Sequence, residues 1–344
     1  MQSCSIGKAR AGTGLTSTVV HARCAVASAK TSAPALRERL DRAEPACESR
    51  RMSQSSSHVA VVTGTSSGIG FATALHLARN GYRVFAGMRN LEKAAPLVEA
   101  ARSEGLALEV IELDVTSGPS VERAFARAAG SAGVDVLVNN AGIGGAAPLE
   151  LVPEAEHRQI FETNYFGAIR CIQAVLPGMR ERRRGTIANV TSTVGRIATA
   201  NQIPYSASKF ALECAGEALA IEVRRFGVRV VNIEPGVILT NIFENSAATT
   251  RYDKTSPYQP IMRRNGKIYA TGFRAGVQPQ AVAEKILEAI TTPDYRLRWP
   301  VGADAIGFET GRPRISDEQW VAMGDDLGDE DYNRRFFEYF GIRL

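Results

Sequence analysis

The fold of this chain is decided by residues 58–70, which read His-Val-Ala-Val-Val-Thr-Gly-Thr-Ser-Ser-Gly-Ile-Gly. The first half of this stretch is short, apolar and β-branched, which predicts a buried strand over residues 58–64. A helical pattern of apolar residues then runs from Ile69 to Arg79 and stops at Asn80-Gly81. Strand, glycine turn and helix form the context in which a parallel α/β sheet binds a dinucleotide, with its pyrophosphate at the helix N-terminus. A purely structural turn remains the alternative on this stretch alone.

The rest of the chain repeats this alternation of strand and helix. Further strands are predicted over 82–88, 108–115, 134–138, 186–190, 228–234 and 297–301. Helices are predicted over 91–103, 120–129, 154–182, 204–226 and 278–291. Alternating elements of this kind predict a Rossmann-type, doubly wound parallel sheet of about seven strands with helices on both faces. We assign it to a single domain over residues 58–305.

The second strand bears on the choice of nucleotide. A site for NAD would place an acid about 20 residues after the glycine turn, on the ribose 2′-hydroxyl. This sequence has no acid there and instead has Arg89, nineteen residues after Gly70. A guanidinium suits a 2′-phosphate, so the sequence favours NADP(H), while NAD(H) is left open and a solvated arginine is the plain alternative.

Polar and small residues follow the next strands. Asp114 ends one of them, and Asn139-Asn140-Ala141-Gly142 follows another, where small residues let a ligand approach the backbone and the asparagines can bond neighbouring strands. Asn164 lies inside a predicted helix, where asparagine is unfavourable, so we expect its side chain to bond another group.

A candidate catalytic pair lies after the fifth strand. Tyr205 and Lys209 are four residues apart at the start of a helix, so they share one face. A nearby ammonium favours the phenolate, so we expect Lys209 to lower the pKa of Tyr205 from its usual value of about 10. Ser192, thirteen residues before the tyrosine, can donate to the same substrate oxygen. One such pair could also arise by chance.

Together and in this order, these motifs make the chain resemble the short-chain dehydrogenase/reductase family over about His58 to Val301, in its roughly 250-residue form. The resemblance implies that Tyr205 is the general acid or base, that Lys209 lowers its pKa and binds ribose hydroxyls, that Ser192 polarises the carbonyl, and that Asn164 holds a relay water. It also implies a set of cofactor-binding residues. These are Gly64, Ser66, Ser67, Gly68, Ile69, Gly70, Arg89, Asp114, Val115, Asn140, Ala141, Gly142, Tyr205, Lys209, Pro235, Gly236, Val237 and Thr240.

The composition excludes several other classes of protein. Residues 1–51 hold nine of the 41 basic and four of the 36 acidic residues, so the whole net charge of +5 lies there and gives no sign of nucleic-acid binding by the body. We interpret residues 1–57 as a disordered or organelle-targeting leader, or as an upstream start artefact with Met52 as the true start. No apolar run is long enough for a membrane span. The cysteines and histidines form no metal motif or disulfide framework, so a cytoplasmic location is the default.

The substrate end of the chain is less specific. We place a substrate lid over residues 241–275, where aromatic residues suit a lipophilic carbonyl of steroid-like or retinoid-like type, and six basic against two acidic residues suit an anionic acyl substrate. A solvated loop is the alternative. Residues 306–344 are predicted to be a helical extension, with a capping box at Ser316 to Gln319 and a packed aromatic face of Phe336, Phe337 and Phe340.

The expected function is therefore the NADP(H)-dependent interconversion of a carbonyl and a secondary alcohol, in a carbonyl reductase or alcohol dehydrogenase. The alternatives are a 3-oxoacyl thioester reductase and a dinucleotide-binding sensor without catalysis. The resemblance also implies a homodimer or homotetramer formed through helices 154–182 and 204–226.

Overall fold

The computed structural model describes residues 58–240 and 250–344 of the chain. The predicted leader and the first part of the predicted lid lie outside the described residues. The strands are β1 (Val59–Thr63), β2 (Arg83–Met88), β3 (Leu108–Glu112), β4 (Val136–Asn139), β5 (Gly185–Val190), β6 (Val228–Pro235) and β7 (Arg298–Val301). The main helices are α1 (Gly68–Arg79), α2 (Ala95–Ser103), α3 (Gly118–Ala129), α4 (Glu154–Phe161), α5 (Gly167–Arg182), α6 (Ile203–Val223), α8 (Gln259–Ala275), α9 (Pro279–Thr291), α10 (Ala303–Gly311), α11 (Asp317–Val321) and α12 (Asp329–Phe340).

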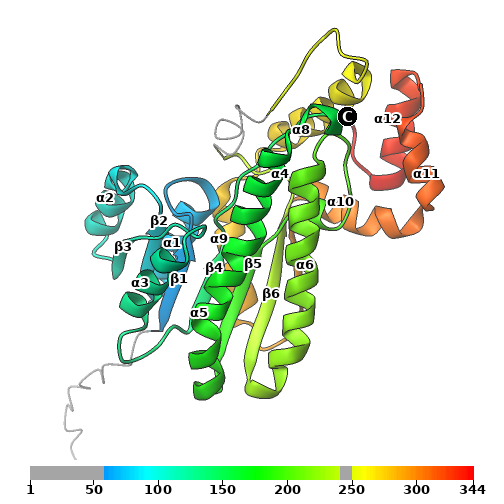
Figure 1. The fold of residues 1–344 in the computed structure, drawn as a ribbon. Coiled ribbons are helices and arrows are strands. Elements are labelled where there is room, and N and C mark those ends of the chain that lie inside the picture. Colours follow the sequence, from blue (N-terminus) through cyan, green and yellow to red (C-terminus); the bar gives the residue numbers. More distant parts are fainter. Residues whose placement is uncertain (1–57, 241–249) are drawn as a thin grey trace, which may run out of the picture. The chain divides into compact units, whose positions relative to one another are not determined.

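The strands form one parallel, seven-stranded sheet in the order β3-β2-β1-β4-β5-β6-β7 (Figure 1). Side chains alternate across it, so Val59 and Val61 of β1 enter one core while Ala60 and Val62 enter the other. Helices α1 and α9 cover one face of the sheet, and α3 and α5 cover the opposite face. Both faces are buried, as expected for a parallel sheet, and the predicted α/β Rossmann-type fold is confirmed.

Two predicted helices differ in detail from the structure. The segment 91–103 is not one helix, because a short 3-10 turn at Leu91–Lys93 precedes α2, whose first turn contains Pro96. Proline lacks an amide donor and is tolerated only in the first turn of a helix, so it marks a new start. The long helix over 154–182 is continuous but contains a π-helical segment, Glu162–Phe166, between α4 and α5.

The chain order of the strands determines where a ligand site can form. After β1 the chain builds β2 and β3 on one side, and then returns to place β4 on the other side of β1. Loops after β1 and β4 therefore diverge from the same edge, which is where doubly wound sheets bind ligands. The predicted motif residues after β1, β4, β5 and β6 all follow the carboxyl ends of these strands.

The C-terminal extension packs as a third apolar cluster. Phe308 of α10 contacts Phe336 and Phe340 of α12, and these rings surround Ile197 from the loop after β5. The predicted capping box at Ser316 and Gln319 is present. The prediction of a fully packed aromatic face is wrong for Phe337, which remains 42% exposed because it lies on the outward side of α12.

Candidate functional site

The turn after β1 depends on glycine at two positions. Gly64 has a φ of 70°, in the left-handed region that glycine adopts without strain, and a methyl group on it would lie 2.8 Å from Cα of Ala141. A methyl group on Gly70 would collide with the carbonyl of Gly64 and lie 2.5 Å from Nδ2 of Asn140. The segment after β4 therefore packs directly against the glycine turn.

Side-chain hydrogen bonds hold these two loops together. Nδ2 of Asn140 donates to the carbonyls of Thr63, at 2.8 Å, and Gly64, at 3.1 Å. Oγ1 of Thr63 accepts from the amides of Asn140 and Ala141, both at 2.9 Å. The predicted bonding of neighbouring strands by the asparagine pair is present, and Asn139 extends it by donating to Asn189 at 3.0 Å.

The start of α1 leaves backbone donors available. Its N-cap residue, Ser67, has an extended backbone and makes no capping hydrogen bond with its side chain, so the first-turn amides keep the positive end of the helix dipole uncovered. Thr65 bonds the carbonyl of Gly87 through its amide, at 3.0 Å, and its hydroxyl, at 3.1 Å. This places Arg89, two residues later and exposed, beside the same turn.

Asp114 and Val115 lie at the end of β3 with different surroundings. Oδ1 of Asp114 accepts from the amide and the hydroxyl of Thr116, at 3.0 and 2.7 Å, which fixes the carboxylate in the turn. Val115 is buried and fills the space beside Gly167, where a methyl group would lie 2.6 Å from Cγ2 of the valine.

Asn164 occupies the π-helical segment and is 1% exposed. Its Oδ1 accepts from the amide of Ile143 at 2.8 Å, and its Nδ2 donates to the carbonyl of Ile143 at 2.9 Å and to Oγ of Ser208 at 3.0 Å. The prediction that this mid-helix asparagine bonds another group is confirmed. Because π-helical turns are frequent at functional sites, this local geometry supports a site here.

Ser192, Tyr205 and Lys209 meet beside this asparagine. Ser192 hydrogen-bonds the half-buried Tyr205, and Nζ of Lys209 lies 5.7 Å from the centre of the tyrosine ring. The ammonium donates to the carbonyl of Val190 at 2.9 Å. A methyl group on Gly142 would lie 3.3 Å from Oδ1 of Asn164 and 3.6 Å from Nζ of Lys209, so glycine leaves space between the two.

Burial dominates the acidity of this pair. Burial raises the pKa of Tyr205 above its usual value, against a smaller opposite effect of the hydrogen bond from Ser192. Burial also lowers the pKa of Lys209 to about 8, against a favourable interaction with Glu213. The direction is opposite to the one expected from Lys209, because burial of the phenol has the largest effect on its pKa.

The loop after β6 is held by a residue that the sequence did not suggest. Oδ2 of Asp304 accepts from the amide of Val237 at 2.7 Å, and its Oδ1 accepts from the amide of Ala305 at 2.9 Å. Gly236 has no room for a side chain because the carboxylate of Asp304 lies against it. The methyl of Thr240 lies 3.1 Å from the position of a methyl group on Gly68, so this loop reaches the glycine turn.

Helix α8, which lies within the segment predicted to be a lid, contacts the loop before α6 and the loop after β6. Nδ2 of Asn265 donates to the carbonyl of Ala200 at 3.2 Å, and Gly272 packs against Val237. One turn after Asn265, Tyr269 hydrogen-bonds Gln202 and lies close enough to Tyr205 to interact with it electrostatically. Sequence reasoning missed Gln202 and Asp304, because neither belongs to a recognisable local pattern.

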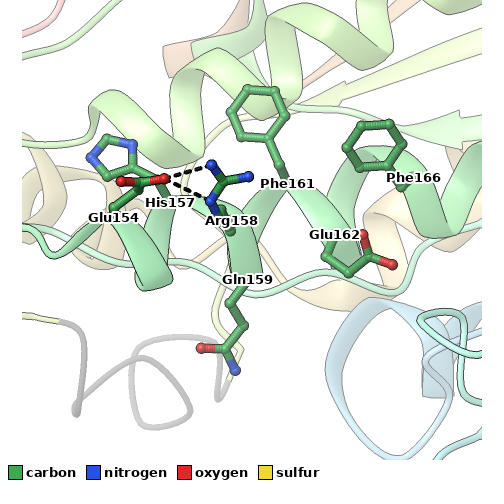
Figure 2. Close-up of a pocket in the computed structure, with 7 residues that line it drawn as sticks. All are labelled: Glu154, His157, Arg158, Gln159, Phe161, Glu162 and Phe166. Atoms are coloured by element: carbon green, nitrogen blue, oxygen red, sulfur yellow. Dashed lines mark hydrogen bonds and ion pairs between the residues drawn. The ribbon is translucent and has the colours of Figure 1, made fainter.

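A surface depression runs along α4 and the π-helical segment (Figure 2). Its lining consists of Glu154, His157, Arg158, Gln159, Phe161, Glu162 and Phe166. The Glu154–Arg158 ion pair spans it at 2.5 Å. It contains none of the predicted site residues. Within the described residues, no group of three or more His, Cys, Asp and Glu side chains is arranged to hold a metal ion.

The structure thus gathers Asn164, Ser192, Tyr205 and Lys209 at one end of the sheet edge, while the glycine turn and Arg89 form the other end. No helix within the two described ranges is long and apolar enough to cross a membrane.

Comparison with known proteins identifies the family. The profile described as short chain dehydrogenase matches residues 58–251. The chain is 38% identical over 256 residues to human retinol dehydrogenase 8, covering 69% of this chain and 79% of that protein. It is 37% identical over 255 residues to rat estradiol 17-beta-dehydrogenase 1, covering 71% and 73%. A crystallised variant of actinorhodin polyketide ketoreductase with NADPH has a TM-score of 0.62 and 31% identity, covering 71% and 95%. The chain therefore belongs to the short-chain dehydrogenase/reductase family, whose members are oxidoreductases acting on CH–OH groups.

Proposed function

We propose that this protein is an NADP(H)-dependent oxidoreductase that interconverts a lipophilic ketone or aldehyde and its alcohol, with Tyr205 as general acid and base. The observation that carries the proposal is the meeting of Asn164, Ser192, Tyr205 and Lys209 beside Gly142, on the same sheet edge as an uncapped helix N-terminus. Groups that transfer a proton and groups that bind phosphate thus lie along a single edge.

The proton steps follow from the side chains. When bound, NADPH would supply a hydride to the carbonyl carbon. Tyr205 donates its hydroxyl proton to the carbonyl oxygen, and Ser192, whose single hydroxyl hydrogen bonds the phenol in the free protein, redirects that hydrogen to the same oxygen. Lys209 stabilises the phenolate that results, because its ammonium lies 5.7 Å from the centre of the ring. Asn164 is fixed by both of its polar atoms and shapes the backbone at Ile143 beside the lysine.

The pKa directions indicate which reaction is easier near neutral pH. A raised pKa keeps Tyr205 protonated, which is the form needed to donate to a carbonyl. Oxidation of an alcohol needs the phenolate and therefore becomes faster at higher pH. We accordingly expect reduction to have the lower pH optimum of the two directions.

The residues of the turn fit a phosphorylated dinucleotide. The first-turn amides of α1 would hold the pyrophosphate, since no side chain caps them. Arg89 is exposed and makes no hydrogen bond or ion pair with the described residues, so its guanidinium is available for a 2′-phosphate, with Ser66 exposed nearby. Asp114 and Val115 would face the adenine, while Val237 and Thr240 would lie at the nicotinamide end.

The contacts of the lid favour a lipophilic substrate over an anionic one. Its basic residues are largely bonded within the chain, because Arg251 pairs with Glu156 and both Arg263 and Lys267 pair with Asp329. Arg264 is 4% exposed and donates to backbone carbonyls of residues 323–327. The names of the two dehydrogenases reported above, which act on retinol and estradiol, agree with an apolar substrate class.

A homodimer or homotetramer through the helices of residues 154–182 and 204–226 is part of the proposal. Large apolar side chains in these segments are exposed, including Phe166 at 47%, Phe210 at 41% and Ile221 at 77%. Burial of such side chains against a second subunit would remove apolar surface from water.

The test is a substrate panel followed by NADPH absorbance, with retinoid, steroid and long-chain ketones set against small aldehydes and a carrier-linked 3-oxoacyl thioester. We expect oxidation of NADPH with apolar carbonyls, and a lower kcat/KM with NADH. Turnover confined to the thioester would favour the acyl reductase. Tight NADPH binding without turnover of any carbonyl would favour the sensor and contradict the proposal.

A further inference from the structure

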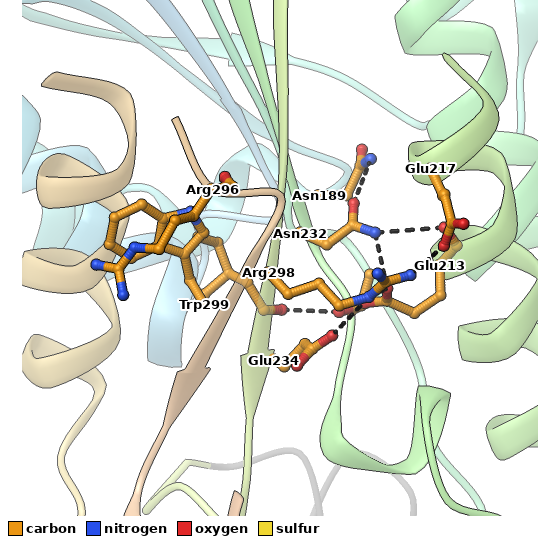
Figure 3. A network of polar contacts seen from close by, with 10 residues as sticks. Asn189, Glu213, Glu217, Asn232, Glu234, Arg296, Arg298 and Trp299 are labelled. Carbon is orange, nitrogen blue, oxygen red and sulfur yellow. Dashed lines mark hydrogen bonds and ion pairs between the residues drawn. The ribbon is translucent and has the colours of Figure 1, made fainter. Parts of the chain in front are cut away.

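Two buried glutamates and the partly buried arginine that contacts both form a polar cluster (Figure 3). Glu213 of α6 is 3% exposed, Glu234 of β6 is 2% exposed, and Arg298 of β7 reaches both. Nε of Arg298 lies 3.1 Å from Oε2 of Glu213 and 3.4 Å from Oε1 of Glu234. The same guanidinium also pairs with the exposed Glu217. Buried charges of this kind are costly unless each is compensated, so the cluster needs an explanation.

The cluster continues the face of α6 that carries the proposed chemistry. Tyr205, Lys209 and Glu213 follow one another at four-residue intervals, so each stands one turn from the next. The backbone at Gly195 closes over this turn, since a methyl group there would lie 3.0 Å from the carbonyl of Lys209 and 3.1 Å from Cγ of Glu213. The backbone of this segment therefore packs against both Lys209 and Glu213.

A row of amides identifies Glu213, and not Glu234, as the ionised one of the two buried carboxyl groups. Asn139 donates to Asn189 at 3.0 Å, Asn189 donates to Asn232 at 3.2 Å, and Asn232 donates to Oε2 of Glu213 at 2.8 Å. The row crosses β4, β5 and β6, and each of its amide groups points its N–H toward the carboxylate. Donors aligned in this way favour a negative charge at their end.

The charges then balance only if Glu234 is neutral. Lys209 and Arg298 are positive, while Glu213 and Glu217 are negative. Burial and the nearby carboxylate of Glu213 raise the pKa of Glu234 to about 8, and Glu309 acts in the same direction while Arg196 opposes it. Glu234 therefore keeps its proton at neutral pH, and Glu213 is the buried anion that remains available to Lys209.

We propose that Glu213 is a positioning residue for the reaction: its carboxylate, fixed by Asn232 and Arg298, keeps the buried Lys209 in its ammonium form one helix turn from Tyr205. The assignment of a role to Lys209 rests on the proposed function. The effect of Glu213 on the charge of Lys209 does not depend on it, because the two side chains stand one helix turn apart whatever reaction the protein performs.

The experiment is a pH titration of the Lys209 side chain by NMR, in full-length protein labelled at lysine Cε and assigned by loss of one signal in Lys209→Arg. We expect a midpoint at about 8 in the wild type. Glu213→Gln removes the charge and should lower this midpoint by about one pH unit or more. Glu217→Gln is the matched control on the same helix and the same guanidinium, and should leave the midpoint in place because Glu217 is exposed. An unchanged midpoint in Glu213→Gln overturns the proposal.

A second variant covers the case in which Glu213→Gln does not fold. Glu213→Asp keeps the charge but withdraws it by one methylene group, so it should lower the midpoint by a smaller amount. A midpoint that does not move in Glu213→Asp overturns the proposal. The alkaline limb of kcat/KM for reduction should move with the midpoint. If the wild type reduces no carbonyl, the proposed function fails while the NMR titration still decides the effect of Glu213. If the wild type reduces a carbonyl but the alkaline limb of kcat/KM does not move in Glu213→Gln, the positioning role of Glu213 fails while the proposed function stands.

Discussion

The candidate site has two ends, the glycine turn after β1 and the group of side chains around Tyr205, and they are built in different ways. At the glycine turn, positive φ angles, uncapped amides and the close approach of Ala141 to Gly64 form the site from backbone. At the tyrosine, the site consists of buried side chains whose charges depend on their neighbours. Backbone sites are fixed by residue types that permit a conformation, whereas side-chain sites also depend on burial. The two ends therefore differ in what a sequence can reveal about them, because residue types are visible in the sequence and burial is not.

Apart from Tyr205 itself, the largest effect that sharpens this comparison is expected from Ser192→Ala. The serine hydroxyl is proposed to donate to the carbonyl oxygen where negative charge develops, so its loss should reduce kcat by about 10²–10³-fold. NADPH affinity should not change, because the glycine turn at the other end is intact. Steady-state kinetics and fluorescence titration measure the two quantities. A matching loss of NADPH affinity would show that the two ends are not separable.

A smaller effect, at the backbone end, is expected from Arg89→Ala. A hydrogen bond to a charged group contributes about 1.5–3 kcal/mol, so NADPH affinity should fall by about 10-fold to 100-fold. NADH affinity should stay the same, because NADH has no 2′-phosphate. Isothermal titration with both nucleotides is the measurement, and Arg83→Ala on the same strand is the control. Equal effects on both nucleotides would remove the claim of NADP(H) preference.

The smallest effect concerns stability rather than turnover. Because the pKa of Glu234 is raised from 4.5 to about 8 in the folded chain, the folded state holds the extra proton between these values. Stability should therefore fall as pH rises through this window. Glu234→Gln mimics the protonated form, so the free energy of unfolding should fall less steeply with pH in this variant. Urea unfolding at several pH values across the window measures the slope. Glu217→Gln should not flatten it, since the pKa of Glu217 is lowered. A slope that persists in Glu234→Gln would contradict the assignment of the proton.

The sequence predicted the sheet, the order of its motifs and most element boundaries, because these depend on local pattern. It also predicted that Asn164 has a bonding partner, since a mid-helix asparagine is locally unfavourable. It could not predict Asp304, because this residue reaches Val237 across 67 positions and resembles an ordinary acid in a first helical turn. It missed Glu213 for a related reason, since the partners Asn232 and Arg298 come from two other elements. The predicted direction of the Tyr205 pKa shift was wrong, because the sequence pattern shows charge but not burial.

The central claim is that Tyr205 supplies the proton while nucleotide binding depends on other residues. The most direct measurement compares wild type and Tyr205→Phe for NADPH affinity and for NADPH oxidation with the best carbonyl of the panel. The account predicts unchanged affinity and a loss of turnover of at least about 10²–10⁴-fold, since the variant lacks only the acidic hydroxyl. A Tyr205→Phe enzyme that reduces the carbonyl at the wild-type rate would contradict it.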